Sequence, residues 1–321
     1  MVPAAALVCA LGCVWCRALA APQDEPTIFR ADTRLVVCNT TVVDNKTSHL
    51  VTDLPKSAFT VFENDVKQEI KVFKREDIPV SMGLIIDNSG SMRQKRASVE
   101  SAALALVKDS NPEDEVFIVN FNDTAYIDNP KGQPFLTDIL EMQEALQRID
   151  ARGGTAMRDA IQESIDWMKK AHKDKKVLVI ITDGVDNSSD EVNNSLENVV
   201  RAARQSGVVI YSVGLLNEEI KRDALRARRE LNALTEASGG EPYYPKDVSE
   251  VERIAHQVAR DIRNQYTIEY SPSNTAMDGT FRKIRVVVTA PGKLTPRTRT
   301  GYYATPDQAK PAAARSGSHL P

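Results

Sequence analysis

The sequence predicts an α/β protein with a doubly wound, mostly parallel sheet and a smaller all-β domain built from the N- and C-terminal flanks. The first observation is a series of short runs that are apolar throughout, typical of strands covered on both faces by helices. The second is the alternation of these runs with helical stretches, the pattern of βαβ units. The third is the period-two alternation of the flanks, which indicates half-buried antiparallel strands.

The composition agrees with such a fold and excludes several classes of protein. The chain has 321 residues, a length that suggests about two domains. Apolar residues make up 42 % and charged residues 26 %, as in ordinary globular proteins, which excludes a disordered, collagenous or coiled-coil chain. The net charge of −3 lacks the basic excess of nucleic-acid-binding proteins. Four scattered histidines argue against a histidine-rich metal centre.

Residues 1–21 are predicted to be a signal peptide. The apolar run 4–16 is shorter than the ~20 residues that cross a bilayer, and the small-x-small tripeptide at 18–20 suits cleavage. A lipoprotein, through residues 11–13, stays open as the alternative. Cleavage would leave Cys38 as the one thiol of the mature chain, which excludes an intramolecular disulfide. We expect an exported protein, periplasmic or secreted, with no transmembrane segment in the mature chain.

The two flanks are predicted to be β-rich. Residues 22–78 and 265–305 contain short runs of β-branched and aromatic residues between polar turns. Each flank alone is short for a stable domain, and the ends of a doubly wound domain commonly lie close together. We therefore expect the flanks to pack as one discontinuous β-sandwich. Residues 306–321, rich in Pro, Ala and Ser, are expected to be a disordered tail.

Residues 79–264 carry the alternation of strands and helices. The nearly continuous apolar runs are 80–86, 116–119, 177–181 and 208–213. Helical patterns cover 97–107, 140–149, 156–171, 196–203, 224–234 and 251–263. In an open α/β sheet, ligands bind beyond the carboxyl ends of the strands, so the loops that follow the apolar runs are the candidates for function.

Three polar loops lie at this expected edge. The segment DNSGS at 87–91 follows the first run, GGT at 153–155 precedes a helix, and TDG at 182–184 follows the third run. Together they would bring five side chains into one cleft: Asp87, Ser89, Ser91, Thr155 and Asp183. Two carboxylates and three hydroxyls, without nitrogen or sulfur, suit a hard cation such as Mg²⁺, Mn²⁺ or Ca²⁺. Such a set leaves a position for an outside ligand, and an incompletely neutralised ion should attract a partner's carboxylate.

The three loops, in this order, resemble the metal-ion-dependent adhesion site of von Willebrand factor type A domains. The resemblance covers roughly residues 79–263 and implies that the five side chains contact the metal directly or through water. The flanks more loosely resemble a bacterial exported family related to this domain. That resemblance rests on FTVFE at 59–63, QEI at 68–70 with Phe73, FRKI at 281–284 and RTGYY at 299–303.

The function expected first is a metal-dependent protein-binding module, adhesive or scaffolding, in the cell envelope or the secreted space. It would bind an Asp or Glu of a protein partner through Mg²⁺, with Mn²⁺ and Ca²⁺ as alternatives. A structural envelope protein whose metal only stiffens the loops stays open. So does a metal-assisted hydrolase, which needs a general base or an activated nucleophile near the metal. No histidine falls in the three loops, so we expect no catalytic residues and no enzyme activity.

Polar residues outside the five have simpler explanations. Asp186 would be either a carboxylate behind the site or a solvated turn residue. Asp159, near the start of a helix, is expected to interact with the helix macrodipole. The arginines between 222 and 229 are expected to form a solvated helix face rather than a phosphate-binding patch.

Overall fold

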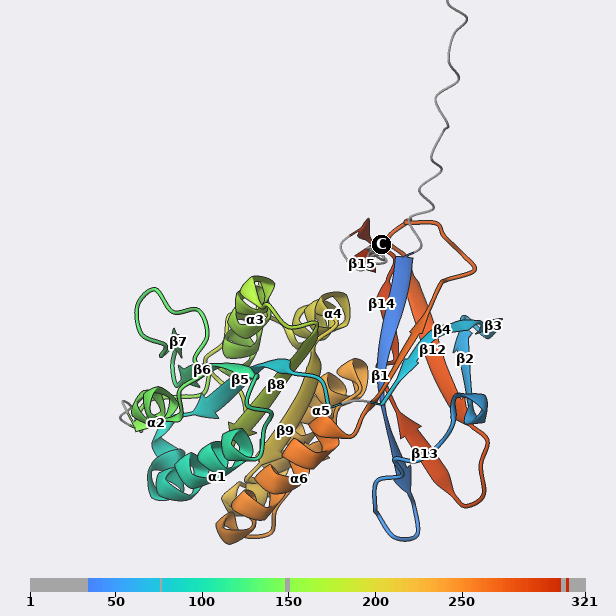
Figure 1. The fold of residues 1–321 in the computed structure, drawn as a ribbon. Helices are drawn as coiled ribbons and strands as arrows, with labels where there is room; N and C mark the ends of the chain where they lie inside the picture. The colour runs from blue at the N-terminus through green and yellow to red at the C-terminus, as the bar shows by residue number, and fades with distance from the viewer. Residues whose placement is uncertain (1–33, 76, 148–150, 307–309, 312–321) are drawn as a thin grey trace, which may run out of the picture. The chain divides into compact units, whose positions relative to one another are not determined.

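The computed structural model describes residues 34–75, 77–147, 151–306 and 310–311. The predicted signal peptide lies outside these residues, as does most of the predicted tail. Within them, the structure confirms the predicted fold class. A mostly parallel sheet is flanked by helices, and separate antiparallel sheets are formed by the N- and C-terminal parts (Figure 1).

The central sheet has the order β10-β9-β8-β5-β6-β7. Its strands are β5 (Val80–Asp87), β6 (Glu115–Phe121), β7 (Ala125–Ile127), β8 (Lys175–Thr182), β9 (Val209–Gly214) and β10 (Pro242–Tyr243). All pairs are parallel except β6 with β7. Strands β5, β6 and β9 are buried along their whole length, which is why the sequence shows them as continuous apolar runs.

Helices cover both faces of this sheet and build two separate cores (Figure 1). One face carries α1 (Arg96–Lys108), α2 (Ile139–Gln147) and α6 (Val251–Arg263), and the other carries α3 (Met157–Trp167), α4 (Leu196–Ser206) and α5 (Lys221–Ser238). Leu84 of β5 points to the first core and Ile85 to the second. Short 3₁₀ turns complete the helical elements: η1 (Lys56–Ala58), η2 (Gly90–Gln94), η3 (Met168–Lys170), η4 (Leu216–Glu218) and η5 (Val248–Glu250).

The chain leaves the neighbouring strands β5 and β8 in opposite directions. After β5 it turns to α1 on one face of the sheet, and after β8 it continues to α4 on the other. Such a divergence is a topological switch point, where the loops at the carboxyl ends of two strands open a crevice. The fold therefore places the DNSGS and TDG loops on either side of that crevice.

The flanking strands form two antiparallel sheets. One has the order β13-β1-β11-β4, with β15 paired to β1, and the other has the order β14-β12-β2-β3. Their bounds are β1 (Arg34–Asp44), β2 (Phe59–Glu63), β3 (Val66–Gln68), β4 (Ile70–Lys74), β11 (Tyr266–Tyr270), β12 (Phe281–Val288), β13 (Leu294–Arg297), β14 (Gly301–Tyr303) and β15 (Lys310–Pro311). N-terminal β1 pairs with C-terminal β11, and N-terminal β2 with C-terminal β12.

The two antiparallel sheets share one apolar core. It includes Cys38 and Ile268 from the first sheet and Val61 and Ile284 from the second. Burial raises the pKa of the Cys38 thiol to about 12, so this side chain is an inert apolar residue. Strand β15 consists of two residues of the predicted tail, and the boundaries predicted for the domains stay predictions. Within the part of the chain that is described, no helix has both the length and the apolar character needed to cross a membrane.

Candidate metal centre

The strand pairing of the central sheet brings the predicted loops to one edge. Ile86 of β5 lies opposite Ile181 of β8, so Asp87 and Asp183 emerge from adjacent parallel strands. The third loop is anchored by its backbone, because the N–H of Gly90 donates to the carbonyl of Gly153 over 3.2 Å. The crevice is thus lined by all three polar loops.

Side-chain contacts confirm that these loops meet. The Ser91 hydroxyl donates to Asp183 Oδ1 over 2.7 Å, and the hydroxyl oxygens of Ser89 and Ser91 lie 3.1 Å apart. The TDG loop passes beside Thr155, since a Cβ added at Gly184 would lie 3.8 Å from Thr155 Oγ1. The structure therefore links Ser89, Ser91 and Asp183 through their side chains, with Asp87 bonded to the Ser89 N–H and Thr155 beside the TDG loop.

Asp87 is a buried carboxylate without a cationic partner. It is 1 % exposed; its Oδ1 accepts the Ser89 N–H over 2.8 Å and its Oδ2 the Thr182 hydroxyl over 2.6 Å. Burial raises the pKa of Asp87 to about 6. The hydrogen bonds lower this pKa, and the negative charge of Asp183 raises it further, but burial has the largest effect. No Lys or Arg of the described ranges forms an ion pair with it. The charge of Asp87 is therefore not balanced by direct contact with a cationic side chain of the described residues.

Asp183 differs because it already has a cation beside it. Lys95 Nζ lies 2.8 Å from Asp183 Oδ2 and 2.8 Å from Glu218 Oε2. Burial lowers the pKa of Lys95. The hydrogen bonds and charges of Asp183 and Glu218 raise it by more, so the pKa of Lys95 lies above its ordinary value. Sequence reasoning missed Lys95; the one available signal was its place four residues after Ser91, at the end of the η2 turn.

Glu219 is a second residue that sequence reasoning missed. It follows η4 beyond the carboxyl end of β9, and a Cβ added at Gly184 would lie 3.9 Å from its Oε1. Burial raises the pKa of Glu219, and the charge of Asp183 adds to this while that of Lys95 opposes it. A pair of acids directly after an apolar run was the signal that could have found it.

The donor set fits a small, hard cation. Two ligands at 2.0–2.1 Å in an octahedral site lie about 2.9 Å apart, close to the 3.1 Å between the Ser89 and Ser91 oxygens. Asp87 supplies a buried negative charge that lacks a counter-ion. Among the described residues, no three His, Cys, Asp or Glu side chains form a metal site. Hydroxyl groups would therefore have to complete the coordination.

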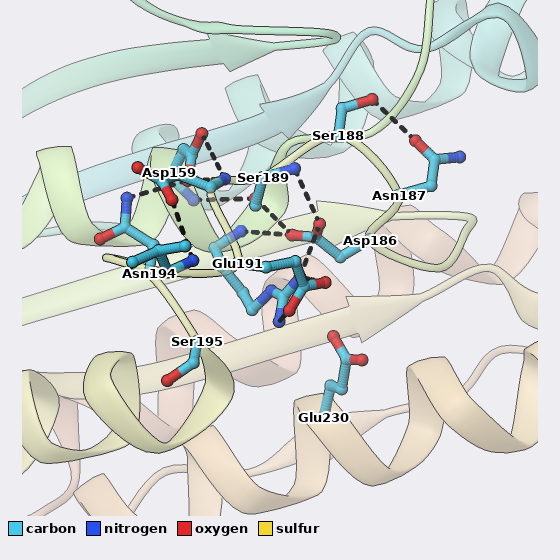
Figure 2. A network of polar contacts seen from close by, with 12 residues as sticks. Asp159, Asp186, Asn187, Ser188, Ser189, Glu191, Asn194, Ser195 and Glu230 are labelled. Atoms are coloured by element: carbon cyan, nitrogen blue, oxygen red, sulfur yellow. Dashed lines mark hydrogen bonds and ion pairs between the residues drawn. The ribbon is translucent and has the colours of Figure 1, made fainter.

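Thr155 is held in place by the loop that follows Asp183. Its N–H donates to Asn187 Oδ1 over 2.9 Å, and its carbonyl accepts the N–H groups of Asn187 and Ser188 over 3.0 and 3.2 Å. Figure 2 shows Asn187 and Ser188 side by side on this loop. The position of Thr155 therefore depends on how residues 185–195 are anchored.

Asp186 provides that anchor and is not a solvated turn residue. It is 0 % exposed; its Oδ2 accepts the Arg158 N–H and the Ser189 hydroxyl, each over 2.7 Å. The Arg158 guanidinium reaches Asp186 Oδ1 over 3.2 Å and Glu191 Oε1 over 2.6 Å (Figure 2). Of the two interpretations of Asp186, the carboxylate behind the site is the one that the structure supports.

Asp159 also does more than interact with the helix macrodipole. Its carboxylate accepts the Asp190 N–H over 3.0 Å and the Asn194 amide over 2.9 Å (Figure 2). Together Arg158 and Asp159 fasten the loop to the first turn of α3. The arginines of α5 are exposed, as expected, and three are engaged within the chain: Arg222 with Asp223, Arg226 with Glu230 and Arg228 over the ring of Tyr244.

Comparison with known proteins agrees with this geometry. Residues 82–185, which contain all three loops, match the family model of the von Willebrand factor type A domain. The YfbK protein of Escherichia coli is 25 % identical over 215 residues, which are 62 % of this chain and 35 % of that protein. The sll0103 protein of Synechocystis is 26 % identical over 152 residues, 47 % of this chain and 35 % of that protein. This chain thus spans about a third of the length of these relatives.

Solved structures show the same fold. A von Willebrand factor type A protein from Catenulispora acidiphila has a TM-score of 0.52 at 15 % identity, covering 85 % of this chain and 75 % of that one. Proximal thread matrix protein 1 from the mussel byssus, with a zinc-occupied adhesion-site motif, has a TM-score of 0.50 at 16 % identity, covering 62 % and 49 %. The sheet order, the three loops at its carboxyl edge and the matched family model lead to one conclusion: residues 82–185 belong to a von Willebrand factor type A domain.

Proposed function

We propose that this protein is a metal-dependent protein-binding module of the cell envelope or secreted space. Its metal would be held by Asp87, Ser89, Ser91, Thr155 and Asp183, and its partner would present an Asp or Glu to the ion. The observation that carries the proposal is a buried carboxylate, Asp87, that has no counter-ion and lies on the same loop as the Ser89 and Ser91 hydroxyls, whose oxygens are 3.1 Å apart. Export rests on the predicted signal peptide, with a lipid tether as the alternative.

The residues of this site would contribute to metal binding in different ways. Asp87 supplies a buried negative charge, fixed in direction by the Ser89 N–H and the Thr182 hydroxyl. Ser89, Ser91 and Thr155 supply neutral oxygens, which bind without cancelling charge. When bound, a divalent cation supplies electrostatic attraction for a carboxylate from outside. The oxygen donors and their spacing favour Mg²⁺, with Mn²⁺ and Ca²⁺ as alternatives; the zinc seen in the mussel protein makes Zn²⁺ a fourth ion to test.

A metal-assisted hydrolase is the alternative function, and the structure suggests how to test it. Glu219 has the raised pKa that a general base requires, whereas His172 and His256 pair with Glu115 and Asp109, away from the three loops. We propose no catalysis, because the hydroxyls and Asp87 would be committed to the ion. Metal-dependent hydrolysis of 4-nitrophenyl acetate or phosphate that is lost in Glu219→Gln would support the hydrolase instead.

Thr155→Ala separates an ion that bridges to a partner from one that only stabilises the loops. The change removes one neutral oxygen, so we expect Mn²⁺ to bind a few-fold more weakly by calorimetry. The affinity of Mn²⁺-loaded protein for a carboxylate should fall more than tenfold, a loss of about 1.4 kcal/mol. Acetate is the probe, and its displacement of Mn²⁺-bound water is followed by water-proton relaxation.

Thr155→Ser serves as the matched control, because it keeps the oxygen and should retain both affinities. Parallel losses of equal size in Thr155→Ala would contradict the bridging function. A wild-type protein that binds Mn²⁺ but no acetate would favour the purely stabilising ion.

A further inference from the structure

Lys95 occupies an unusual position for a lysine. It follows the η2 turn and precedes α1, yet it is only 9 % exposed. Its ammonium group lies between a fully buried carboxylate, Asp183, and a carboxylate on the surface, Glu218, at 2.8 Å from each. A lysine is rarely this buried without a specific partner, so its charge is part of how the site is built.

The contacts of Asp183 show what Lys95 does to it. Asp183 Oδ1 accepts the Ser91 hydroxyl and Asp183 Oδ2 faces the ammonium group. One of the two carboxylates of the site therefore has its charge balanced by the chain itself, and the other, Asp87, does not. The charges of Asp87, Asp183 and Lys95 sum to −1, and they would sum to −2 without the lysine; Glu218 and Glu219 lie beside these groups and are not part of this sum.

We propose that Lys95 is a specificity-determining residue of this site. Its positive charge lowers the affinity of the site for the cation, and it raises the affinity of the metal-loaded site for a partner's carboxylate. This deepens the proposed function and rests on it. With a divalent cation bound, the ammonium makes the site one unit more positive than it would be without the lysine, whatever negative charge Glu218 and Glu219 add beside it. An incoming anion is attracted by this added positive charge.

Lys95→Met tests the proposal with Mn²⁺ and acetate as probes. The methionine keeps the length of the stem and removes the charge, so Mn²⁺ should bind at least tenfold more tightly by calorimetry. Acetate should displace Mn²⁺-bound water at least tenfold less readily, measured by water-proton relaxation. Lys95→Arg keeps the charge and should stay near wild type in both. Lys108→Met removes the same charge from the other end of α1, where Lys108 is exposed, and should change neither.

Glu218→Gln provides an independent test with the opposite sign. This side chain is 77 % exposed, so the change should leave the fold intact even if Lys95→Met does not fold without metal. Removing its negative charge should weaken Mn²⁺ binding a few-fold, the limited effect of a screened surface charge, and strengthen acetate binding. The two variants should therefore move metal affinity in opposite directions.

The outcomes show separately whether the proposed function fails or only the role of Lys95 fails. If the wild type binds no divalent cation, the proposed function and this inference both fail. If the wild type binds Mn²⁺ but folded Lys95→Met binds it no more tightly, Lys95 is only a structural counter-ion and the inference alone is overturned. Glu218→Gln that tightens Mn²⁺ binding would overturn it as well.

Discussion

Asp87→Asn should stabilise the metal-free protein at neutral pH and abolish its stabilisation by metal. The asparagine can still accept the Ser89 N–H and can donate to the Thr182 hydroxyl, so the two local contacts of Asp87 survive. What disappears is a buried negative charge. The pKa of Asp87 is raised to about 6 by burial, and two units above the ordinary value correspond to about 3 kcal/mol.

The direction of the pH dependence follows from proton binding. Between about pH 4 and pH 6 the folded, metal-free protein holds a proton on Asp87 that the unfolded chain has released. The free energy of unfolding contributed by this group therefore decreases as the pH rises through that window. The advantage of Asp87→Asn in EDTA should be near zero below pH 4 and should approach ~3 kcal/mol at pH 7. Urea unfolding of both proteins across this range measures it.

Addition of metal should reverse the order of the two proteins. Wild type should gain about 4.1 kcal/mol at a cation concentration about 1,000 times the dissociation constant, more than the ~3 kcal/mol advantage of Asp87→Asn, and Asp87→Asn should gain nothing. Asp114→Asn is the matched control, because burial also raises the pKa of Asp114, which lies just before β6 at the other edge of the sheet. It should keep the full response to metal. A response to metal that survives in Asp87→Asn would remove Asp87 from the site.

That the DNSGS and TDG loops meet at one edge could be predicted because each follows an apolar run of the sequence. Asp87 and Asp183 directly follow apolar runs, and parallel strands bring such positions to one edge. Lys95 could not be predicted this way, since a lysine at the start of a helix is usually a surface residue. Its contact with Asp183 spans 88 positions of the chain, and it depends on the direction in which η2 turns. The role of Asp186 likewise depends on Arg158, across 28 positions.

The flanks show the same division between local pattern and long-range pairing. The local patterns predicted β-rich flanks, and β2, β4 and β12 are among the strands that form there. The pairing of β1 with both β11 and β13 is set by contacts between the two ends of the chain, which no local pattern carries. In the central sheet, β7 and β10 are three and two residues long, too short to show a period.

Arg158→Met should be among the most destabilising single changes at the site, although Arg158 touches no proposed metal ligand through its side chain. The side chain is 4 % exposed and reaches a carboxylate, Asp186, that is entirely buried. Removing one member of a buried ion pair costs about 3–5 kcal/mol, because the other charge stays buried without its partner. Thermal and urea unfolding in EDTA should show a loss of this size.

A double variant and a surface variant identify the cause of that loss. Asp186→Asn combined with Arg158→Met removes both charges and should recover most of the stability. The asparagine oxygen can still accept hydrogen bonds from the backbone N–H of residue 158 and from the Ser189 hydroxyl. Glu191→Gln changes the other partner of Arg158, which is 65 % exposed, and should cost at most ~1 kcal/mol. A loss from Glu191→Gln as large as that from Arg158→Met would assign the effect to the surface pair instead.

The same variant should weaken metal binding from a distance. Asp186 and Arg158 hold the loop whose Asn187 and Ser188 backbone groups fix the Thr155 carbonyl, so a loosened loop lets Thr155 leave its position. We expect Mn²⁺ affinity in Arg158→Met to fall at least as far as in Thr155→Ala, and the double variant with Asp186→Asn to restore part of it. Metal affinity that is unchanged in a folded Arg158→Met protein would show that Thr155 is placed by its own helix, and that this ion pair contributes to stability alone.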